Sequence, residues 1–424
     1  LGLGDIGPLA AKPVMEGKAV LFKKFAGVDV FDIEINEKDP QKLVEVIAAL
    51  EPTFGAINLE DIKAPDCFYV ERELRKRLNI PVFHDDQHGT AITVAAAMVN
   101  ALTVAGKKIE EVKLVASGAG AAALACLNLL LVLGLKRENV FVTDLAGVVY
   151  EGRAELMDED KALFAQKTEL RTLAQVIEGA DVFLGLSAGN VLKKEMVATM
   201  AAKPIIFALA NPTPEILPED VKAVRSDAII ATGRTDYPNQ VNNVLCFPYI
   251  FRGALDCGAT TITKEMEVAA VHAIADLAKA EQSEEVAAAY IGHTLSFGPE
   301  YLIPKPFDPR LMLIVAPAVA QAAAECGVAQ RPIADMAAYR EQLKTFVYAS
   351  GTMMKPIVMA AKKATKKRVA FAEGEEERVL RAAQVVIDER IARPTLIGRP
   401  GVIAKRIEKF GLRLQEGRDY DVVN

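Results

Sequence analysis

The 424-residue chain has few cysteines, and they form no recognisable pattern. The five cysteines are odd in number and scattered, without the close spacing of a zinc site or of a disulfide framework. We therefore expect free, buried thiols in a reducing compartment, which indicates the cytoplasm. The positions are Cys67, Cys126, Cys246, Cys257 and Cys326.

The sequence also lacks an excess of positive charge and long uninterrupted apolar runs. Its formal net charge is −6 at pH 7, so it carries no electrostatic footprint of a protein that binds nucleic acid or a membrane surface. The apolar runs are too short or too interrupted to span a bilayer. A hydrophobic fraction of 51% instead predicts a well-packed α/β enzyme, with about two or three domains at this length.

The first residues, LGLGDIGPLAAKP, lack an initiating methionine and the pattern of a signal peptide. The last residues, DYDVVN, stop as abruptly, so we expect an internal piece of a longer protein. Gly2, Gly4 and Gly7 spell the glycine pattern of a dinucleotide site, but no strand precedes them in the sequence. We interpret them as a tight structural turn.

The most informative stretch is residues 80–91, which reads IPVFHDDQHGTA. Its apolar start predicts a short buried strand that ends in two adjacent carboxylates, Asp85 and Asp86. A second acidic pair, Glu60 and Asp61, follows a similar strand in AINLEDI. Adjacent carboxylates are costly to bury unless a cation neutralises them, so the two pairs indicate a metal with oxygen ligands. A solvated turn with a helix N-cap is the alternative interpretation.

A second glycine-rich turn lies within a complete strand, turn, helix and strand unit. A β-type run leads into Gly118 and Gly120, an apolar helix begins at Ala121, and the next strand ends in Asp144. This order predicts a dinucleotide site, with the pyrophosphate at the helix N-terminus and an acid on the adenosine ribose. Asp144 weakly favours NAD over NADP, because apolar residues follow it and Arg153 is the nearest base downstream.

Three further strand-like runs close the predicted sheet, and each ends in small or polar residues. Because ligands bind at the carboxyl ends of parallel strands, we expect Ser187 and Asn211 to face the cofactor. Asn243, in a later loop, is another uncharged donor, although both asparagines could be ordinary turn residues. The three runs are residues 181–186, 204–210 and 228–232.

Several motifs together carry a resemblance to a known family. FHDDQHGTA, NLEDIKAP and PVMEGK, with FALANPTPE and PNQVNNVLCFP, resemble the motifs of malic enzymes over roughly residues 1–345. The later segment KRVAFAEGEEERVLRAAQ is similar to the start of phosphotransacetylase domains. The combination resembles the large bacterial malic enzymes, in which a phosphotransacetylase-like domain follows the catalytic part.

The resemblance implies an α/β fold in three parts, truncated at both ends. A partial malic enzyme N-terminal catalytic domain spans residues 1–87, and a doubly wound Rossmann-type NAD(P)-binding domain with C-terminal helices spans residues 88–345. After a linker at 346–366, which contains a basic run, a partial phosphotransacetylase-like α/β domain occupies residues 367–424. By the same resemblance we expect a homo-oligomer, and a regulatory role for the last domain as a sensor of acyl-CoA, with acetyl-CoA as the effector.

The resemblance further implies oxidative decarboxylation of (S)-malate to pyruvate and CO2, with reduction of NAD+ or NADP+. Lys18 would be the general base, which requires a lowered pKa, and Asp85 would position Lys18 or the substrate. Asn211 and Asn243 would hold the malate carboxylates. The family's protonating tyrosine and its substrate-binding arginine would both precede the first residue. The expected Mg2+ or Mn2+ ligands are Glu60, Asp61 and Asp86, and the expected cofactor contacts are Gly118, Gly120, Ala121, Asp144, Ser187 and Asn211.

Two other kinds of function stay open. A metal-dependent hydroxyacid dehydrogenase that does not decarboxylate would use a similar cofactor domain, although the two acidic pairs argue against it. A regulatory or scaffold protein could bind nucleotides or acyl-CoA without catalysis, and residues 367–424 keep that class possible. The large bacterial malic enzymes are often NADP-dependent, against the local preference for NAD, so both cofactors stay open.

Overall fold

The computed structural model describes residues 7–280, 296–388 and 390–424, with the backbone alone for residues 348–358. The chain forms two compact units, Leu1–Lys344 and Thr345–Asn424. Gly2 and Gly4 of the first glycine pattern lie outside the described residues.

The N-terminal part of the first unit is built on a two-stranded parallel sheet. Leu59 in β1 lies beside His84 in β2, so the two acidic pairs leave neighbouring strand ends on the same edge. Helices α2 and α3 pack on this sheet, and α1 packs against α10, where Phe22 contacts the ring of Phe247. The elements are α1 (Gly7–Ala26), α2 (Pro40–Ala48), β1 (Ile57–Leu59), α3 (Asp66–Arg77) and β2 (Val82–His84).

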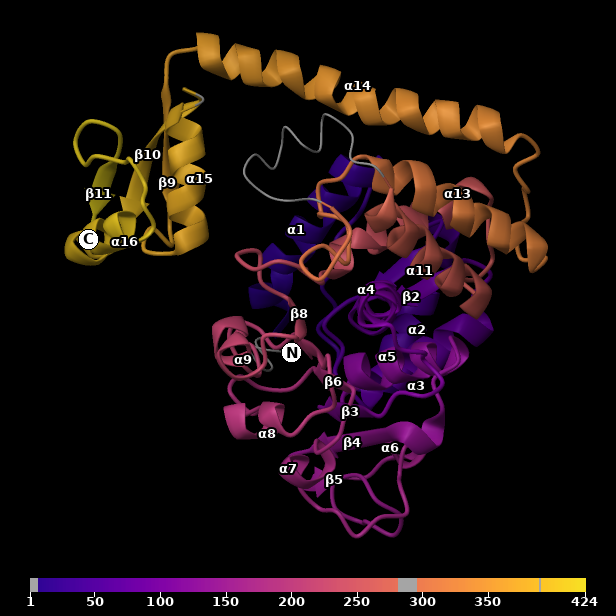
Figure 1. Ribbon diagram of the computed structural model, residues 1–424. Helices are drawn as coiled ribbons and strands as arrows, with labels where there is room; N and C mark the ends of the chain where they lie inside the picture. Colours follow the sequence, from indigo (N-terminus) through magenta and orange to yellow (C-terminus); the bar gives the residue numbers. More distant parts are fainter. Residues whose placement is uncertain (1–6, 281–295, 389) are drawn as a thin grey trace. The chain divides into compact units, whose positions relative to one another are not determined.

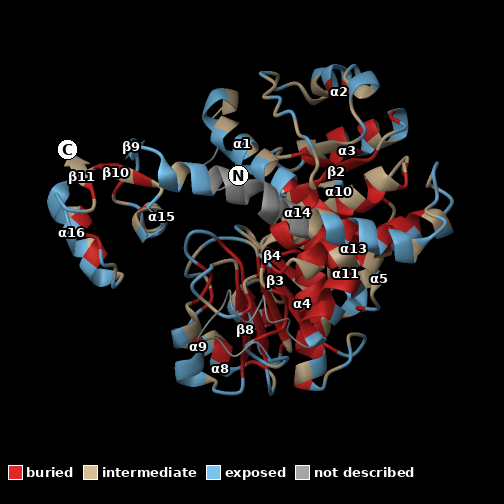
Figure 2. Cartoon of the chain, turned by 90° about the horizontal axis from the view of Figure 1, so that it is seen from above, coloured by how far each residue is buried: buried red, intermediate tan, exposed pale blue. Residues whose placement is uncertain are grey.

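A single π-helical turn, η2 (Asp85–Gly89), joins β2 to helix α4 (Thr90–Ala105). Such turns are rare and frequently occur at functional sites. By length and composition alone, the helical stretch Asp85–Ala105 could cross a membrane. However, 78% of its most apolar window is buried inside the protein, as in the core helix of a globular domain. Figure 2 shows α4 largely as buried.

The centre of the first unit is a six-stranded sheet in the order β5-β4-β3-β6-β7-β8, parallel except for β5 (Figure 1). All the residues of β3, β6, β7 and β8 are buried, because helices cover the sheet. The predicted Rossmann-type α/β fold is therefore confirmed. The strands are β3 (Leu114–Ser117), β4 (Val140–Asp144), β5 (Gly147–Val148), β6 (Val182–Gly185), β7 (Ile205–Ala208) and β8 (Ile229–Thr232). The helices between them are α5 (Ala121–Val132), α6 (Glu159–Ala162), α7 (Leu173–Val176), α8 (Lys194–Ala198) and α9 (Pro218–Val224).

The remaining helices of the first unit follow the sheet. Helix α10 (Phe247–Asp256) packs on α13 (Arg310–Glu325), and α13 packs on α11 (Lys264–Lys279). All five cysteines are free, and four are buried as expected. Cys326 is exposed at the C-terminal end of α13, so the expectation of a buried thiol was wrong there.

The second unit begins within the long helix α14 (Met336–Lys363), which takes up most of the segment predicted as a linker. It continues as a three-stranded parallel sheet in the order β11-β10-β9, with two helices. Alternating strands and helices of this kind match the predicted start of a new α/β domain. The elements are β9 (Lys367–Phe371), α15 (Glu377–Asp388), β10 (Ala392–Ile397), α16 (Pro400–Lys409) and β11 (Asp421–Val423).

Candidate active site

Lys18 lies at the centre of a buried carboxylate cluster. Its Nζ atom is 2.5 Å from Oδ2 of Asp85 and 2.9 Å from Oε1 of Glu60. The three side chains expose 12%, 0% and 9% of their surface, so this is a buried ion-pair network. Asn243, in the short 3₁₀ turn η4 (Asn243–Leu245), donates from Nδ2 to Oδ2 of Asp85 at 2.5 Å. Helix α1, the ends of β1 and β2, and η4 thus meet at one place.

The two acidic pairs contact each other through the backbone of Asp61 and the carboxylate of Asp86. The backbone N–H of Asp61 donates to Oδ2 of Asp86 at 2.8 Å, and Asp61 adopts a left-handed backbone with φ 58°. This contact links the loop after β1 to the π-helical turn after β2. Among the described residues, no group of three or more His, Cys, Asp or Glu side chains is placed to hold a metal ion as it stands.

The electrostatics of the cluster nevertheless fit a hard divalent cation. Burial raises the pKa of Asp85 to about 7 and that of Glu60 to about 7, even though Lys18 lowers both. Burial also raises the pKa of Asp86 to about 6. The Oδ1 atom of Asp85 is buried and has no hydrogen-bond partner. Buried carboxylate oxygens that the protein neutralises only in part are the donor set that Mg2+ or Mn2+ prefers.

Lys18 differs from the sequence-based expectation in one respect. Burial alone would lower its pKa, but the charges of Asp85 and Glu60 outweigh that effect and raise it above the ordinary value. The protein groups by themselves therefore hold Lys18 protonated, whereas a general base must be neutral. The ring of Phe247, 4.3 Å from Nζ, adds a favourable cation–π contact.

His88, in the same turn as Asp85 and Asp86, lies close to two buried glutamates. The Nε2 atom of His88 lies 2.7 Å from Glu71 in α3, and its Nδ1 atom lies 3.4 Å from Glu267 in α11. The two glutamates are almost fully buried. Since α3 and α11 belong to different parts of the first unit, both helices meet the acidic turn at His88.

The glycine motif has the geometry of a phosphate site. Gly118 has φ +109°, and a side chain there would overlap the carbonyl of Leu186, so the tight turn requires glycine. Helix α5 starts at Ala121, with Gly120 before it, and no side chain caps its first backbone N–H groups. Those groups and the positive end of the helix dipole suit a pyrophosphate. The same helix packs against the acidic turn η2.

Asp144, expected to hold the ribose, is already paired with two buried cations. Its Oδ2 atom accepts from Arg153 and, at 2.9 Å, from Nζ of Lys161, and its Oδ1 atom accepts from the N–H of Ala146 at 2.9 Å. Burial raises the pKa of Asp144, but hydrogen bonds from Arg153 and Lys161 lower it below the usual value overall. Two cations beside one carboxylate leave a net positive charge at the end of β4. The local argument for NAD considered only the apolar residues after Asp144; these contacts place two cations there, and the choice between NAD and NADP stays a prediction.

Comparison with known proteins identifies the family. Residues 1–75 match the model of the malic enzyme N-terminal domain, residues 87–290 that of the malic enzyme NAD-binding domain, and residues 352–424 that of phosphate acetyl/butaryl transferases. An NADP-dependent malic enzyme of Halomonas elongata is 54% identical over 332 residues, which are 78% of this chain and 78% of that one. The chain belongs to the malic enzyme family.

Two further members show how much of the family fold is covered. A crystal structure of a malic enzyme from Pyrococcus horikoshii matches with a TM-score of 0.77 and 42% identity, over 84% of this chain and 81% of that chain. An NAD-dependent malic enzyme of Rhizobium meliloti is 66% identical over 424 residues, 100% of this chain and 55% of the relative. The chain spans about half the length of that relative.

Within this malic enzyme fold, the predicted site residues form two groups. The first contains Lys18, Glu60, Asp85 and Asn243. Beside it, the backbone N–H of Asp61 donates to the carboxylate of Asp86. In the second, the hydroxyl of Ser187 lies 2.9 Å from that of Ser117, directly before Gly118. Asn211 contacts neither group in the described part of the chain, and it donates to the carbonyl of Leu209 at 3.3 Å.

Sequence reasoning missed several residues that shape the site. Three charged residues are buried, and composition and periodicity do not predict such positions: Lys161, Glu215 and Glu267. Only Glu215 had a sequence signal, because it closes the quoted motif FALANPTPE.

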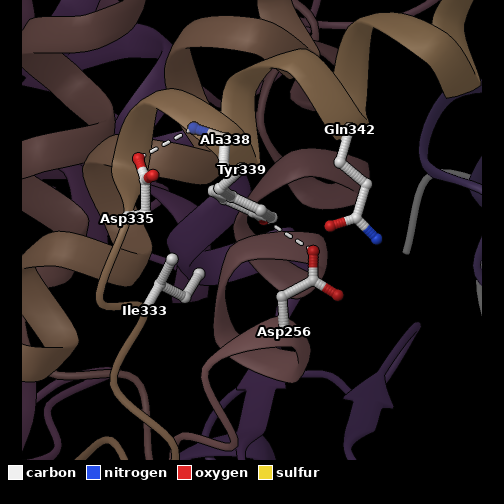
Figure 3. A pocket seen from close by; sticks show the side chains of 6 residues that line it. All are labelled: Asp256, Ile333, Asp335, Ala338, Tyr339 and Gln342. Atoms are coloured by element: carbon white, nitrogen blue, oxygen red, sulfur yellow. Dashed lines mark hydrogen bonds between the residues drawn. The ribbon is translucent and has the colours of Figure 1, made fainter.

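A separate cavity of about 320 Å³ lies between the end of α10 and the start of α14 (Figure 3). Its two carboxylates already have partners, since Asp256 accepts from the hydroxyl of Tyr339 at 2.6 Å and Asp335 from the N–H of Ala338 at 2.9 Å. The cavity contains none of the predicted site residues. Its lining is Asp256, Ile333, Asp335, Ala338, Tyr339 and Gln342.

Proposed function

We propose that this chain catalyses the oxidative decarboxylation of (S)-malate to pyruvate and CO2 with reduction of NAD+ or NADP+. The observation that carries the proposal is the convergence of Lys18 with Glu60, Asp85 and Asn243, beside a helix that starts at a dinucleotide turn. A lysine among buried carboxylates can exchange a proton with a substrate hydroxyl. The malic enzymes named above, which share this fold, support the same reaction class.

The chain's own residues would act as follows. Lys18 would accept the proton of the malate C2 hydroxyl as hydride leaves C2 for the nicotinamide, and Asp85 would keep its Nζ atom in place. Asn243 donates to the same Oδ2 atom of Asp85 as Lys18 and would present its remaining amide atoms to a substrate carboxylate. A divalent cation bound by Glu60, Asp61 and Asp86 would supply Lewis-acid polarisation of the hydroxyl and then the ketone, and its charge would offset the carboxylates that keep Lys18 protonated.

The direct test is an assay of the intact protein that carries this sequence, with (S)-malate, Mn2+ and each cofactor separately. We expect reduced nicotinamide and pyruvate to form in equal amounts. Oxaloacetate without pyruvate would indicate a hydroxyacid dehydrogenase that does not decarboxylate. A folded chain that turns over malate with neither cofactor would contradict the proposal and favour a binding or regulatory role.

We also propose that Arg153 and Lys161 admit the 2′-phosphate of NADP+ at the end of β4. Both cations are buried beside Asp144, and a phosphate there would gain charge-assisted hydrogen bonds. Replacement of Lys161 by glutamine should lower kcat/KM for NADP+ by about ten- to a hundredfold, since one such bond contributes roughly 1.5–3 kcal/mol. The value for NAD+ should change by less than about threefold.

Steady-state kinetics with both cofactors will measure this effect, and Lys167→Gln is the matched control because Lys167 is an exposed lysine in the following loop. An equal loss with NAD+ and NADP+ would mean that Lys161 supports the fold rather than the 2′-phosphate. A divalent metal, homo-oligomer formation, a cytoplasmic location and the sensing of acetyl-CoA by residues 367–424 remain predictions.

A further inference from the structure

Glu215 is a fully buried carboxylate that the reaction scheme does not use. It lies in the loop between β7 and α9, and its side chain exposes none of its surface. Its Oε1 atom accepts from the backbone N–H of Ser187 at 2.9 Å and from the Ser187 hydroxyl at 3.4 Å. Its Oε2 atom accepts from the backbone N–H of Ala210 at 3.0 Å. One carboxylate therefore joins the loops that follow β6 and β7.

The neighbouring residues pack closely against the Glu215 carboxylate. A side chain at Gly185, the last residue of β6, would overlap the Glu215 carboxylate, so the close approach requires glycine. Ser187 also bonds Ser117, and the N–H of Leu186 donates to the Ser117 carbonyl at 2.8 Å. The ends of β3, β6 and β7 are thus held together through Glu215. Burying a charged group at such cost calls for a reason beyond packing.

The topology places these loops over one half of the cofactor. The strand order reverses between β3 and β6, and a dinucleotide binds across the crevice at such a switch point. A dinucleotide bound there would place its adenosine half towards β4, where Asp144 ends the strand. Its nicotinamide half would then lie towards β6 and β7, whose loops carry Ser187 and Asn211.

We propose that Glu215 is a positioning residue, which holds the Ser187 and Ala210–Asn211 loops in the shape that binds the nicotinamide half of NAD(P). This inference rests on the proposed function only in that a dinucleotide binds. Glu215 touches neither substrate nor cofactor in this scheme. Its three accepted hydrogen bonds come from donors alone, so an amide in its place would turn an N–H group towards at least one N–H or O–H donor.

The test compares Glu215→Gln with the unaltered intact protein that carries this sequence, in two binding measurements. The fluorescence of bound NADPH reports the whole cofactor, and calorimetry with 2′,5′-ADP reports the adenosine half alone. We expect the Kd for NADPH to rise by about tenfold or more, and the Kd for 2′,5′-ADP to stay within about twofold. Glu219→Gln is the matched control, because Glu219 is a glutamate four residues on that bonds the exposed Tyr237 hydroxyl instead.

Each outcome decides the proposal. An NADPH Kd within about twofold of the unaltered chain would overturn it, and so would an equal loss of both ligands, which indicates general unfolding. If Glu215→Gln does not fold, Glu215→Asp decides, since it keeps the carboxylate but withdraws it from the loop donors; it should weaken NADPH and spare 2′,5′-ADP, and no change would overturn the proposal. An unaltered chain that binds NADPH without turning over malate would contradict the proposed reaction alone. A chain that binds neither NADPH nor NADH would overturn both.

Discussion

Replacing Lys18 with alanine is expected to lower kcat for malate oxidation by about a hundred- to ten-thousandfold, the usual contribution of a general acid or base. The variant removes the group that exchanges the hydroxyl proton, and it also removes the cation that neutralises Asp85 and Glu60. Without that cation, the pKa values of both carboxylates should rise further. Turnover should fall far more than the affinity for Mn2+ does, because a proton taken up by a carboxylate, or the bound Mn2+ itself, can replace the lost positive charge.

Stopped-flow and steady-state absorbance of the reduced nicotinamide will measure this loss. Lys23→Ala is the matched control, since Lys23 lies on the same helix in an exposed pair with Asp29 and should leave kcat unchanged. A folded Lys18→Ala variant that keeps kcat within about threefold of the unaltered protein would show that Lys18 takes no part in the proton transfer. Equal losses of kcat in both variants would instead indicate that the substitutions disturb the folding of helix α1.

The sequence was sufficient to predict which strands carry the acidic pairs. Both IPVF and AINL are short apolar runs that end in carboxylates, and parallel pairing at a common edge brings such ends together, as Leu59 and His84 show. The Rossmann unit was predictable for a similar reason, because its glycine turn and acid occur in a fixed order along one short segment.

The long-range partners could not be predicted in the same way. Lys18 meets Asp85 across 67 positions of sequence, and Lys161 reaches Asp144 across 17. Neither spacing corresponds to a helical or strand period, so only the packing of α1 and α6 sets these contacts. The raised pKa of Lys18 depends on the same packing, which brings its Nζ atom within 2.9 Å of Asp85 and Glu60, and the expected lowering beside a bound metal ion stays a prediction.

Affinity for Mn2+ is expected to rise as the pH increases from about 5 to about 8. The pKa values of Glu60 and Asp85 are raised to about 7 and that of Asp86 to about 6, so a bound ion must compete with protons over this range. The same shifts fix the sign for stability in the presence of a chelator. Carboxyl groups with raised pKa values favour the folded chain at low pH, and this contribution is lost as the pH rises through 6 to 7.

The midpoint of thermal unfolding should therefore fall between about pH 5 and pH 8 with a chelator, and the increase caused by Mn2+ should grow over the same interval. Calorimetry in two buffers of different ionisation enthalpy should show protons released on binding. Asp86→Asn should bind Mn2+ at least about tenfold more weakly and lose malate turnover, whereas Asp66→Asn at the start of α3 should behave as the unaltered chain. An increase in the unfolding midpoint that does not depend on pH would show that Mn2+ does not bind these carboxylates, because a cation bound elsewhere would not compete with their protons.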